Sequence, residues 1–530
     1  MEHLMILSSC ALFILSIFIL FKLTGAASRR RSSTSRPGAK LPPGPWRLPI
    51  IGNLHNMVGS APHERLTELA KKHGPLMHLK LGQVSTIVVS SRDVAREMMK
   101  THDLCISDRP VTPSIEIFTY GGQGLIFTPY GEYWRQMRKI CVLELLSQKR
   151  VQSFRSIREE EVSKFIHSIY SEATTTTSSA SSSRRPVVNI SEKLATLTNN
   201  VITRVSVGKL WEDRHTFLMA LDEAGIASAG FNVADFYPSL KFLTKLTGLS
   251  RRLKRNHWKL DSVFQSVLRE HELRREETKQ KGVIPENEDL VDVLLRVREE
   301  GGLQHPLTME GVKSVIFDIF GGGTETSSNT MEWAMAEMIR NPEVMNKAQS
   351  EVREVLQGKT EVTEEDIDGL NYLKLVIKET LRLHTPAPLL LPRECRETCE
   401  VMGYQVPAGA KVLVNAWAMS RDPAYWDEPL KFWPERFEQS TAVNFNGSCY
   451  EFIPFGSGRR MCPGMLFGLA NVELPLAQLL YYFDWKLPNG LEADHPQELD
   501  MSDSFGVLLR KKLDLLLLPL PRGVVPCPKS

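Results

Sequence analysis

The longest apolar run in the chain lies at its N-terminus. Residues 4–21 are uncharged and mostly apolar, and a basic cluster follows them from Lys22 to Lys40. As a helix, this run would be about 27 Å long, close to the thickness of a hydrocarbon core. It is longer than the apolar region of a signal peptide, and its basic flank keeps the following chain in the cytosol. We therefore expect a single-pass transmembrane anchor at 1–24, a basic and proline-rich linker at 25–45, and a globular domain at 46–530.

The hydrophobic period changes to two between Leu76 and Val89. Apolar residues at 77, 79 and 81 alternate with polar residues at 78 and 80, Gly82 marks a turn, and the β-branched run "STIVV" follows. This pattern predicts a β-hairpin. Shorter strand-like segments return at 404–414 and 512–518.

Most of the remaining chain has helical periodicity. The longest candidate helix runs from Gly311 to Arg340 and ends at Asn341–Pro342, a typical terminator. The polar, low-complexity segment Ser171–Arg185 is expected to form an exposed loop rather than a domain boundary. The predicted fold class is mostly α with a minor β part.

The charge and cysteine content exclude two classes of protein. The 65 basic and 62 acidic residues of this 530-residue chain give a net charge of +3, which gives no support to a nucleic-acid-binding role. Eight cysteines are too few for a disulfide framework and indicate a reducing compartment. Cys395 and Cys399 lie four apart, but no second cysteine or histidine pair accompanies them in sequence. A zinc site is therefore not expected.

The segment "FGGGTETSS", residues 320–328, is costly for a helix interior. Each of its three glycines destabilises a helix by about 0.8–1 kcal/mol relative to alanine, so their presence calls for another reason. Glycine lets a flat ligand approach the backbone and can leave a groove. Glu325 and Thr326 place an acid and an alcohol beside that groove, suited to proton relay. The alternative is a loop followed by a helix.

Two further pairs have helical spacing. Glu379 and Arg382 are three apart, and Arg436 in "FWPERF" is a candidate third partner for a buried network. Trp134 and Arg138 are four apart and pair an indole donor with a cation, which suits an anionic cofactor group. Taken alone, the first pair is typical of surface contacts and the second of packing.

The loop "PFGSGRRMCPG", residues 454–464, fits the pattern F-x-x-G-x-R-x-C-x-G. Its glycines allow backbone N–H groups to point at the Cys462 sulfur and hold it as a thiolate. Arg460 adds positive potential, and Phe455 can pack beside the sulfur. A nucleophilic cysteine is the rival interpretation, but no histidine arrangement suggests a base.

Together these motifs make the chain resemble the cytochrome P-450 family of haem-thiolate monooxygenases over essentially its whole length. The segments "PPGPWRLPIIGNLH" and "FIPFGSGRRMCPG" resemble most the plant microsomal enzymes that oxidise sesquiterpenes and diterpenes. The resemblance implies the cytochrome P-450 fold at 46–530 and haem b as cofactor. It also implies insertion of one oxygen atom of dioxygen into an apolar small molecule.

The resemblance also assigns roles to residues. Cys462 is implied as the iron ligand, and Phe455 and Gly464 as further cofactor contacts. Trp134, Arg138, Arg393 and Arg460 match positions that hold the haem propionates. Glu325 and Thr326 match the acid–alcohol pair that delivers protons, with glutamate where aspartate is commoner. Glu379, Arg382 and Arg436 match a structural network behind the haem.

The implied substrate pocket draws on four segments near residues 115–126, 317–324, 387–391 and 505–508, with an almost wholly apolar lining. Its expected members are Ile117, Phe317, Phe320, Gly322, Leu389, Leu390 and Val507. Such a lining favours a terpenoid hydrocarbon. Phenolic or alkaloid substrates, a reductase-independent haem isomerase and a non-catalytic haem-binding membrane protein remain alternatives.

The electron source must be a separate protein, because the chain has no G-x-G-x-x-G motif after a strand. By resemblance it is the membrane-bound NADPH–cytochrome P-450 reductase. Membrane lipid is the other expected partner, and no nucleic acid is expected. We expect the protein in the endoplasmic reticulum membrane with its catalytic domain in the cytosol.

Overall fold

The computed structural model describes residues 40–175, 186–210, 214–228, 233–240, 242, 244, 248–282, 288–438, 443–488, 497, 499–523 and 525–527. The predicted anchor at 1–24 and the first part of the linker lie outside these residues. Among the described residues, no helix combines the length and apolar character needed to cross a bilayer.

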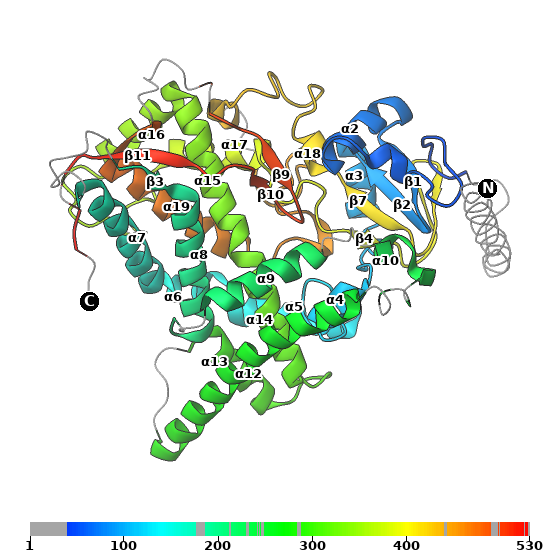
Figure 1. Cartoon of the computed structure of the whole chain (residues 1–530), viewed down its shortest axis with the longest axis horizontal. Helices are drawn as coiled ribbons and strands as arrows, with labels where there is room; N and C mark the ends of the chain where they lie inside the picture. The colour runs from blue at the N-terminus through cyan, green and yellow to red at the C-terminus, as the bar shows by residue number, and fades with distance from the viewer. Residues whose placement is uncertain are drawn as a thin grey trace, which may run out of the picture.

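Helices make up most of the molecule, as the sequence predicted, and the largest group of strands lies on the right of the view, with smaller groups elsewhere (Figure 1). The helices are α2 (Pro62–His73), α3 (Arg92–Arg96), α4 (Pro113–Phe118), α5 (Glu132–Ile140), α6 (Gln148–Ser153), α7 (Arg155–Thr175), α8 (Ile190–Val207), α9 (Arg214–Ser228), α10 (Val233–Phe236), α12 (Leu249–Lys281), α13 (Leu290–Glu300), α14 (Met309–Gly323), α15 (Glu325–Arg340), α16 (Pro342–Val355), α17 (Asn371–Leu383), α18 (Ala416–Met419) and α19 (Met465–Tyr482). Single helical turns include η1 (Leu54–Met57), η2 (Glu97–Thr101), η3 (Cys141–Leu145), η5 (Pro238–Leu240), η6 (Pro434–Phe437) and η7 (Gly458–Arg460).

Within the described residues the strands form four small sheets. The largest has the order β1 (Leu76–Leu81), β2 (Val84–Val89), β7 (Lys411–Val414) and β4 (Arg393–Glu394). The others pair β3 (Val188–Asn189) and β8 (Phe483–Lys486) with β11 (Leu516–Pro521), β5 (Cys399–Val401) with β6 (Tyr404–Val406), and β9 (Asp503–Phe505) with β10 (Leu509–Lys511). Several of these pairs join segments that are distant in sequence.

The hairpin predicted at Leu76–Val89 is confirmed. β1 and β2 pair antiparallel with Leu76 opposite Val89, and Gly82 turns between them with a φ of +59°. Both strands are largely buried because α2 covers one face, where Leu66 packs against Met77. Because both faces are buried, apolar and polar residues alternate less regularly along these strands than along a strand with one exposed face.

The long helix predicted from Gly311 to Arg340 is two helices that meet at Thr324. α14 ends at Gly323 and α15 begins at Glu325, so the three glycines interrupt the helix where the sequence suggested a local widening. The predicted end at Arg340 is confirmed. α15 is buried along most of its length between α8, α17 and α19, which places the break at the centre of the molecule (Figure 1).

Two boundary predictions need correction. Residues Ser171–Thr175 of the predicted exposed loop belong to α7, and the rest of that loop lies outside the described residues. The strand predicted at 512–518 begins only at Leu516.

The end of the predicted linker contacts the globular domain. The His78 N–H donates to the Pro43 carbonyl at 2.8 Å, and the Gln405 N–H donates to the Lys40 carbonyl at 2.9 Å.

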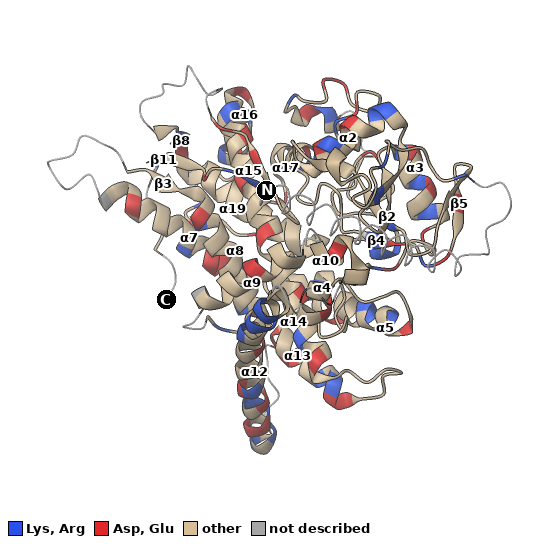
Figure 2. Cartoon of the chain, turned by 45° about the vertical axis from the view of Figure 1, so that its right-hand side comes forward, with Lys and Arg blue, Asp and Glu red and all other residues tan. Residues whose placement is uncertain are grey.

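Basic and acidic residues are intermixed over the described surface. Figure 2 shows both kinds side by side along α12, and their near-balance agrees with the net charge of +3.

Candidate active site

A cavity of about 810 Å³ lies at the interruption between α14 and α15. Its walls come from α5, from the loop before α19, from the segment 386–393 and from the β9–β10 hairpin. Most of the candidate residues named from sequence therefore meet at one place.

The cysteine loop forms one end of the cavity. Gly456 and Gly458 adopt φ values of +73° and +70°, a left-handed conformation that glycine adopts without strain. The Cys462 N–H donates to the Phe455 carbonyl at 2.9 Å, which closes the loop. Gly464 precedes α19 as its N-cap residue and directs its N–H toward the Cys462 sulfur. The glycine-rich turn predicted from the sequence is present, whereas the predicted thiolate state of Cys462 stays a prediction.

Opposing effects act on the Cys462 thiol. Burial is the larger effect and raises the pKa of the Cys462 thiol above its ordinary value, although the Gly464 N–H and the charge of Arg138 oppose the shift. The Cys462 sulfur lines the cavity. A ligand inside the cavity can therefore reach this thiol.

A set of cationic and indole donors surrounds the same end. The Arg138 guanidinium donates to the Met461 carbonyl at 2.9 Å, and the Trp134 indole N–H donates to the Leu125 carbonyl at 3.0 Å. Arg460 lies over the Trp134 ring at 4.4 Å. Arg393 is buried, donates to the Ser457 carbonyl at 2.6 Å and pairs with Asp103 at 2.9 Å. All four predicted donors line the cavity.

Arg109 is a fifth donor that sequence reasoning missed. It lines the cavity and donates to the carbonyls of Ile126, Leu391 and Pro392. Burial and the charges of Arg460 and Arg393 lower its pKa. Its short motif "SDRP" carries no periodic signal, so only the fold reveals this position.

This donor set fits a dianionic ring cofactor. Burial, and then the charge of Arg393, lower the pKa of Arg460 to about 9. Buried cations that repel one another call for an anionic partner, and the two carboxylates of haem supply the required charge. With Cys462 at the same end, the residues present fit haem b.

The three glycines beside the cavity have different roles. A Cβ on Gly321 would meet nothing within 4 Å, and one on Gly322 would lie 3.9 Å from Ile126, so both face open space in the cavity. A Cβ on Gly323 would lie 2.6 Å from Ile202 of α8. Gly323 therefore allows close helix packing, whereas Gly321 and Gly322 leave room for a ligand.

Thr326 and Glu325 both line the cavity, but their partners differ. The Thr326 hydroxyl donates to the Gly322 carbonyl at 2.8 Å, across the glycine break. Glu325 forms an ion pair with Arg510, which also pairs with Asp222 at 2.8 Å. The sequence predicted the acid and the alcohol but not Arg510, which lies at the other end of the chain on β10.

Asp318 is a further residue of the cavity wall that sequence reasoning missed. Its Oδ2 accepts from the Leu125 and Ile126 N–H groups at 2.5 and 3.0 Å. Burial raises its pKa to about 6, although these two donors oppose the shift. Asp318 thereby anchors the 124–127 segment to α14 and sets one wall of the cavity.

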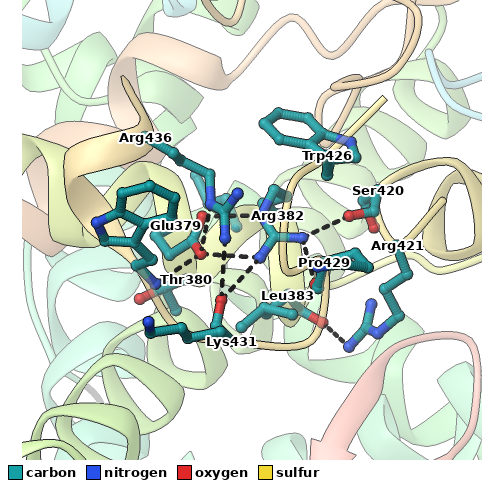
Figure 3. Close-up of polar contacts among 12 residues, drawn as sticks. Glu379, Thr380, Arg382, Leu383, Ser420, Arg421, Trp426, Pro429, Lys431 and Arg436 are labelled. Carbon is teal, nitrogen blue, oxygen red and sulfur yellow. Dashed lines mark hydrogen bonds and ion pairs between the residues drawn. The ribbon is translucent and has the colours of Figure 1, made fainter. Parts of the chain in front are cut away.

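The predicted network of Glu379, Arg382 and Arg436 is confirmed. Figure 3 shows the Glu379 carboxylate between the two guanidiniums. Arg382 reaches both its oxygens at 2.8 Å, and Arg436 Nε lies 3.0 Å from Oε1. Arg382 also donates to the Ser420 and Pro429 carbonyls. The network ties α17 to the segment 420–436 and lies outside the cavity lining, so its role is structural.

The predicted substrate residues divide into two groups. Phe317, Gly322, Leu390 and Val507 line the cavity as expected. The other three, Ile117, Phe320 and Leu389, are not among its lining residues: Phe320 packs against Phe217 at 5.1 Å, Leu389 belongs to the cluster around β1 and β2, and Ile117 packs on the main core.

The family comparison agrees with this geometry. The family model named Cytochrome P-450 matches residues 42–518. The chain belongs to the cytochrome P-450 family. Its likeness to solved structures includes a zebra fish cytochrome P-450 with abiraterone, at a TM-score of 0.71 and 25% identity over 88% of this chain and all of that one.

Plant cytochromes P-450 of similar length are close in sequence. Premnaspirodiene oxygenase of Hyoscyamus muticus is 49% identical over 96% of this chain and 98% of its own. Germacrene A hydroxylase of Barnadesia spinosa is 48% identical, with 95% of each chain covered. Desmethyl-deoxy-podophyllotoxin synthase of Sinopodophyllum hexandrum is 51% identical over 98% and 97%.

As a member of this family, the protein is a haem-dependent monooxygenase. When bound, haem supplies the iron centre at which dioxygen is activated. Cys462 would bind this iron through its sulfur, and Trp134, Arg138, Arg393 and Arg460 would hold the propionates. Thr326 Oγ1 lies beside the helix interruption with its proton donated to the Gly322 carbonyl, from which it could relay a proton. The aromatic and aliphatic wall residues would exclude water.

Proposed function

We propose that this cytochrome P-450 hydroxylates a sesquiterpene or diterpene hydrocarbon in plant specialised metabolism. The observation that carries the proposal is the apolar wall of Phe317, Leu390, Val507 and Leu508 facing the Gly321–Gly322 opening. A hydrocarbon without polar anchors is held by such a wall through shape and burial. The relatives named for premnaspirodiene and germacrene A support the same substrate class.

The test uses membranes containing this protein, a plant NADPH–cytochrome P-450 reductase and NADPH. A panel of sesquiterpene and diterpene hydrocarbons is offered beside phenolic and alkaloid compounds, and products are identified by mass spectrometry. We expect a gain of one oxygen atom on one or more terpenes. Turnover confined to the phenolic or alkaloid compounds would overturn the terpenoid proposal and leave the monooxygenase assignment standing.

A second candidate is oxidation of a more polar substrate. Arg510, Asp222 and Glu325 form a charged group, of which Arg510 and Glu325 border the cavity. A polar group on a substrate would find donors and acceptors there. The relative named desmethyl-deoxy-podophyllotoxin synthase also keeps a different product class open, and the polar compounds of the panel address it.

The thiol assignment has its own test. We expect the reduced, carbon-monoxide-treated protein to show the red-shifted Soret band of thiolate-ligated haem. Cys462→Ser should abolish that band, whereas Cys527→Ser, which changes an exposed cysteine outside the cavity lining, should retain it. Persistence of the band in Cys462→Ser would contradict the assignment.

We infer that a reductase docks on the cysteine side of the molecule. Arg135 and Lys139 lie on the exposed side of α5, whose buried side carries Trp134, and Arg459 is partly exposed beside them in the cysteine loop. An acidic flavin domain would be attracted there. Lys139→Glu should raise the reductase concentration needed for half-maximal turnover, whereas Lys72→Glu on α2 should not. An equal response of the two variants would contradict this docking face.

We also propose membrane attachment at the endoplasmic reticulum, through the apolar run at 4–21 and exposed apolar side chains of the globular domain. Trp46 and Val58 are 73% and 75% exposed, and Val233 and Phe242 are also exposed. The Gln83 N–H donates to the Phe236 carbonyl at 2.8 Å, which ties the region around α10 to the β1–β2 hairpin. Deletion of residues 1–24 should weaken membrane binding, and adding Trp46→Ser and Val58→Ser should release the protein further into the soluble fraction. Unchanged sedimentation would contradict the proposal.

A further inference from the structure

A group of soft ligands lies away from the cavity. His102, Cys105 and Cys399 each offer one ligand atom, and these three atoms lie within 4.8 Å of one another. The sequence argued against a zinc site because Cys395 and Cys399 had no second pair. The fold supplies the missing partners from a distant segment of the chain.

Backbone hydrogen bonds hold the two segments together. The Arg396 N–H donates to the Cys105 carbonyl at 2.7 Å, and the Glu394 N–H donates to the Asp108 carbonyl at 2.8 Å. Cys399 begins β5, where it lies opposite Val406 of β6. The ligands are therefore carried by a paired backbone on both sides, which is the support that a preorganised site requires.

The ligand types and spacing suit a zinc-type ion. Zinc binds thiolate sulfur at about 2.3 Å and imidazole nitrogen at about 2.0–2.1 Å, so ligand atoms in a tetrahedral site lie about 3.3–3.8 Å apart. The three ligand atoms lie within 4.8 Å of one another. To reach the tetrahedral spacing they would have to move closer together, by side-chain shifts of about 1 Å. Two thiolates and one neutral imidazole also balance the charge of a divalent cation.

Two carboxylates complete the surroundings. Glu97 Oε1 lies 3.3 Å from His102 Nε2, which orients the imidazole and leaves Nδ1 for an ion. Glu397 Oε1 lies 3.5 Å from Cys105 Sγ and can provide a fourth ligand. The Cys395 thiol instead donates to the Glu397 carbonyl at 2.9 Å. We propose that His102, Cys105 and Cys399 bind a zinc-type divalent ion, with Glu397 or water as fourth ligand.

A second cluster of possible metal ligands among the described residues already contains a cationic side chain. His271, Asp289 and Asp292 also lie within reach of one ion. Arg274 lies between the two carboxylates, however, at 3.2 Å from Asp289 and 2.7 Å from Asp292. A fixed cation already neutralises that group, whereas the sulfur group has no such cation among its described contacts.

The proposed ion would stabilise the segment that supports the haem-binding loop. Asp103 lies between two of the ligands in sequence. Its carboxylate accepts from Arg393 at 2.9 Å and from the Arg459 side chain at 2.8 Å. An ion held by His102 and Cys105 would fix this turn, so we expect bound Zn²⁺ to raise the unfolding temperature and to slow haem loss.

The test uses the full-length haem-loaded protein, reduced and then freed of reductant. Cd²⁺, a soft analogue of Zn²⁺, should produce a thiolate-to-metal charge-transfer absorption that saturates at one equivalent and is displaced by Zn²⁺. Cys105→Ser and Cys399→Ser should each abolish this absorption, and Glu97→Gln should weaken binding about 10–100-fold. Cys527→Ser is the matched control and should behave as the unaltered protein. The carbon-monoxide spectrum of each variant verifies that it folds.

A second measurement needs no substitution. Zn²⁺ should protect Cys105 and Cys399, but not Cys527, from alkylation read by peptide mass spectrometry. Absence of protection, or Cd²⁺ absorption that survives in both serine variants, would overturn the proposal. An intact mass smaller by two hydrogen atoms, with metal binding restored only by a reductant, would instead show a Cys105–Cys399 disulfide and also overturn it.

Discussion

At the residue scale, the site depends on a few side chains whose roles follow from one contact each. Thr326 is the simplest case. Its hydroxyl lines the cavity and donates to the Gly322 carbonyl at 2.8 Å. The interruption of the helix at Thr324 thus places this hydroxyl at the cavity wall, where it can take part in proton relay.

Thr326→Ala should therefore lower the rate of product formation by about 10²-fold, the usual loss on removing a positioned proton donor. Thr326→Ser should retain most of the rate, and both should keep the carbon-monoxide spectrum. The matched control is Ser328→Ala, which removes a helix hydroxyl that bonds only to the Thr324 and Glu325 carbonyls. Equal losses in Thr326→Ala and Ser328→Ala would indicate a helix defect rather than a proton relay.

Asp318 gives a pH dependence with a definite sign. Because burial raises its pKa to about 6, the folded protein binds a proton that the unfolded chain releases between about pH 4 and 6. The contribution of Asp318 to the free energy of unfolding is therefore largest at low pH and falls as the pH rises through this window. Asp318→Asn should remove that slope in unfolding experiments between pH 4 and 7.

Asp318→Ala tests the anchoring role separately. It would leave the buried Leu125 and Ile126 N–H groups without their acceptor, at a cost of about 1–3 kcal/mol for each group. We expect a loss of stability and weaker substrate binding measured by spectral titration. Binding as tight as in the unaltered protein would contradict the role of Asp318 in shaping the cavity.

At the element scale, the Glu379 network joins α17 to η6 and to the segment before it. Glu379 and Arg382 are fully buried and neutralise each other, and Arg436 adds a second positive charge to the same carboxylate. A buried ion pair adds little to the free energy of unfolding compared with a pair of hydrophobic residues at the same place. Loss of a single charged partner is costly, however, because the other charge stays buried.

Glu379→Gln should accordingly destabilise the protein by about 3–5 kcal/mol and accelerate haem loss, measured by denaturant unfolding and by the decay of the Soret band. The control is Glu68→Gln, which breaks the exposed Arg65–Glu68 pair on α2 and should cost less than about 1 kcal/mol. A similar small effect of both substitutions would show that the network does not hold these elements.

At the scale of the whole molecule, buried histidines connect segments that are distant in sequence. His63 of α2 lies between Trp417 of α18, at 4.8 Å, and Phe505 of β9, at 5.6 Å. Burial, and then the charge of Arg421, lower its pKa to about 4. The ring is therefore neutral in the folded protein near neutral pH.

Acid should weaken this junction. The unfolded chain takes up a proton on His63 near pH 6.5, whereas the folded protein does so only near pH 4, so the free energy of unfolding falls as the pH falls between these values. The loss is about 3 kcal/mol. His63→Phe should reduce the slope of stability against pH below 6.5. An unchanged slope would contradict the role of His63 in this pH dependence. Part of the slope should remain in both the unaltered protein and the variant, because burial also lowers the pKa of His78 to about 4.

Sequence reasoning succeeded where a structure is formed by residues that are close together in the sequence. The β1–β2 hairpin follows from period-two alternation and a turn glycine, and the end of α15 follows from Asn341–Pro342. Cys462 follows from a loop whose glycines and sulfur lie in one short segment. In each case the residues that interact are neighbours in sequence, so their spacing already contains the geometry.

Sequence reasoning failed where interacting residues are distant in sequence. It also failed where the direction of a side chain around its helix decides whether the residue lines the cavity. Phe320 was assigned to the cavity, but its ring packs against Phe217 instead. Arg510 reaches Glu325 from the other end of the chain, and Cys105 joins Cys399 from another segment. No spacing rule covers such pairs, because chain topology alone brings them together.

The sequence by itself determined the fold class, the family, the position of the thiol and the residues of the Glu379 network, since motifs and periodicity are properties of short segments. Only the tertiary structure decided which residues line the cavity, that Arg510 pairs with the acid beside it, and that Asp318 anchors its wall. It also decided that the sulfur ligands meet an imidazole. These outcomes depend on how distant helices and strands pack, and packing is a property of the whole chain.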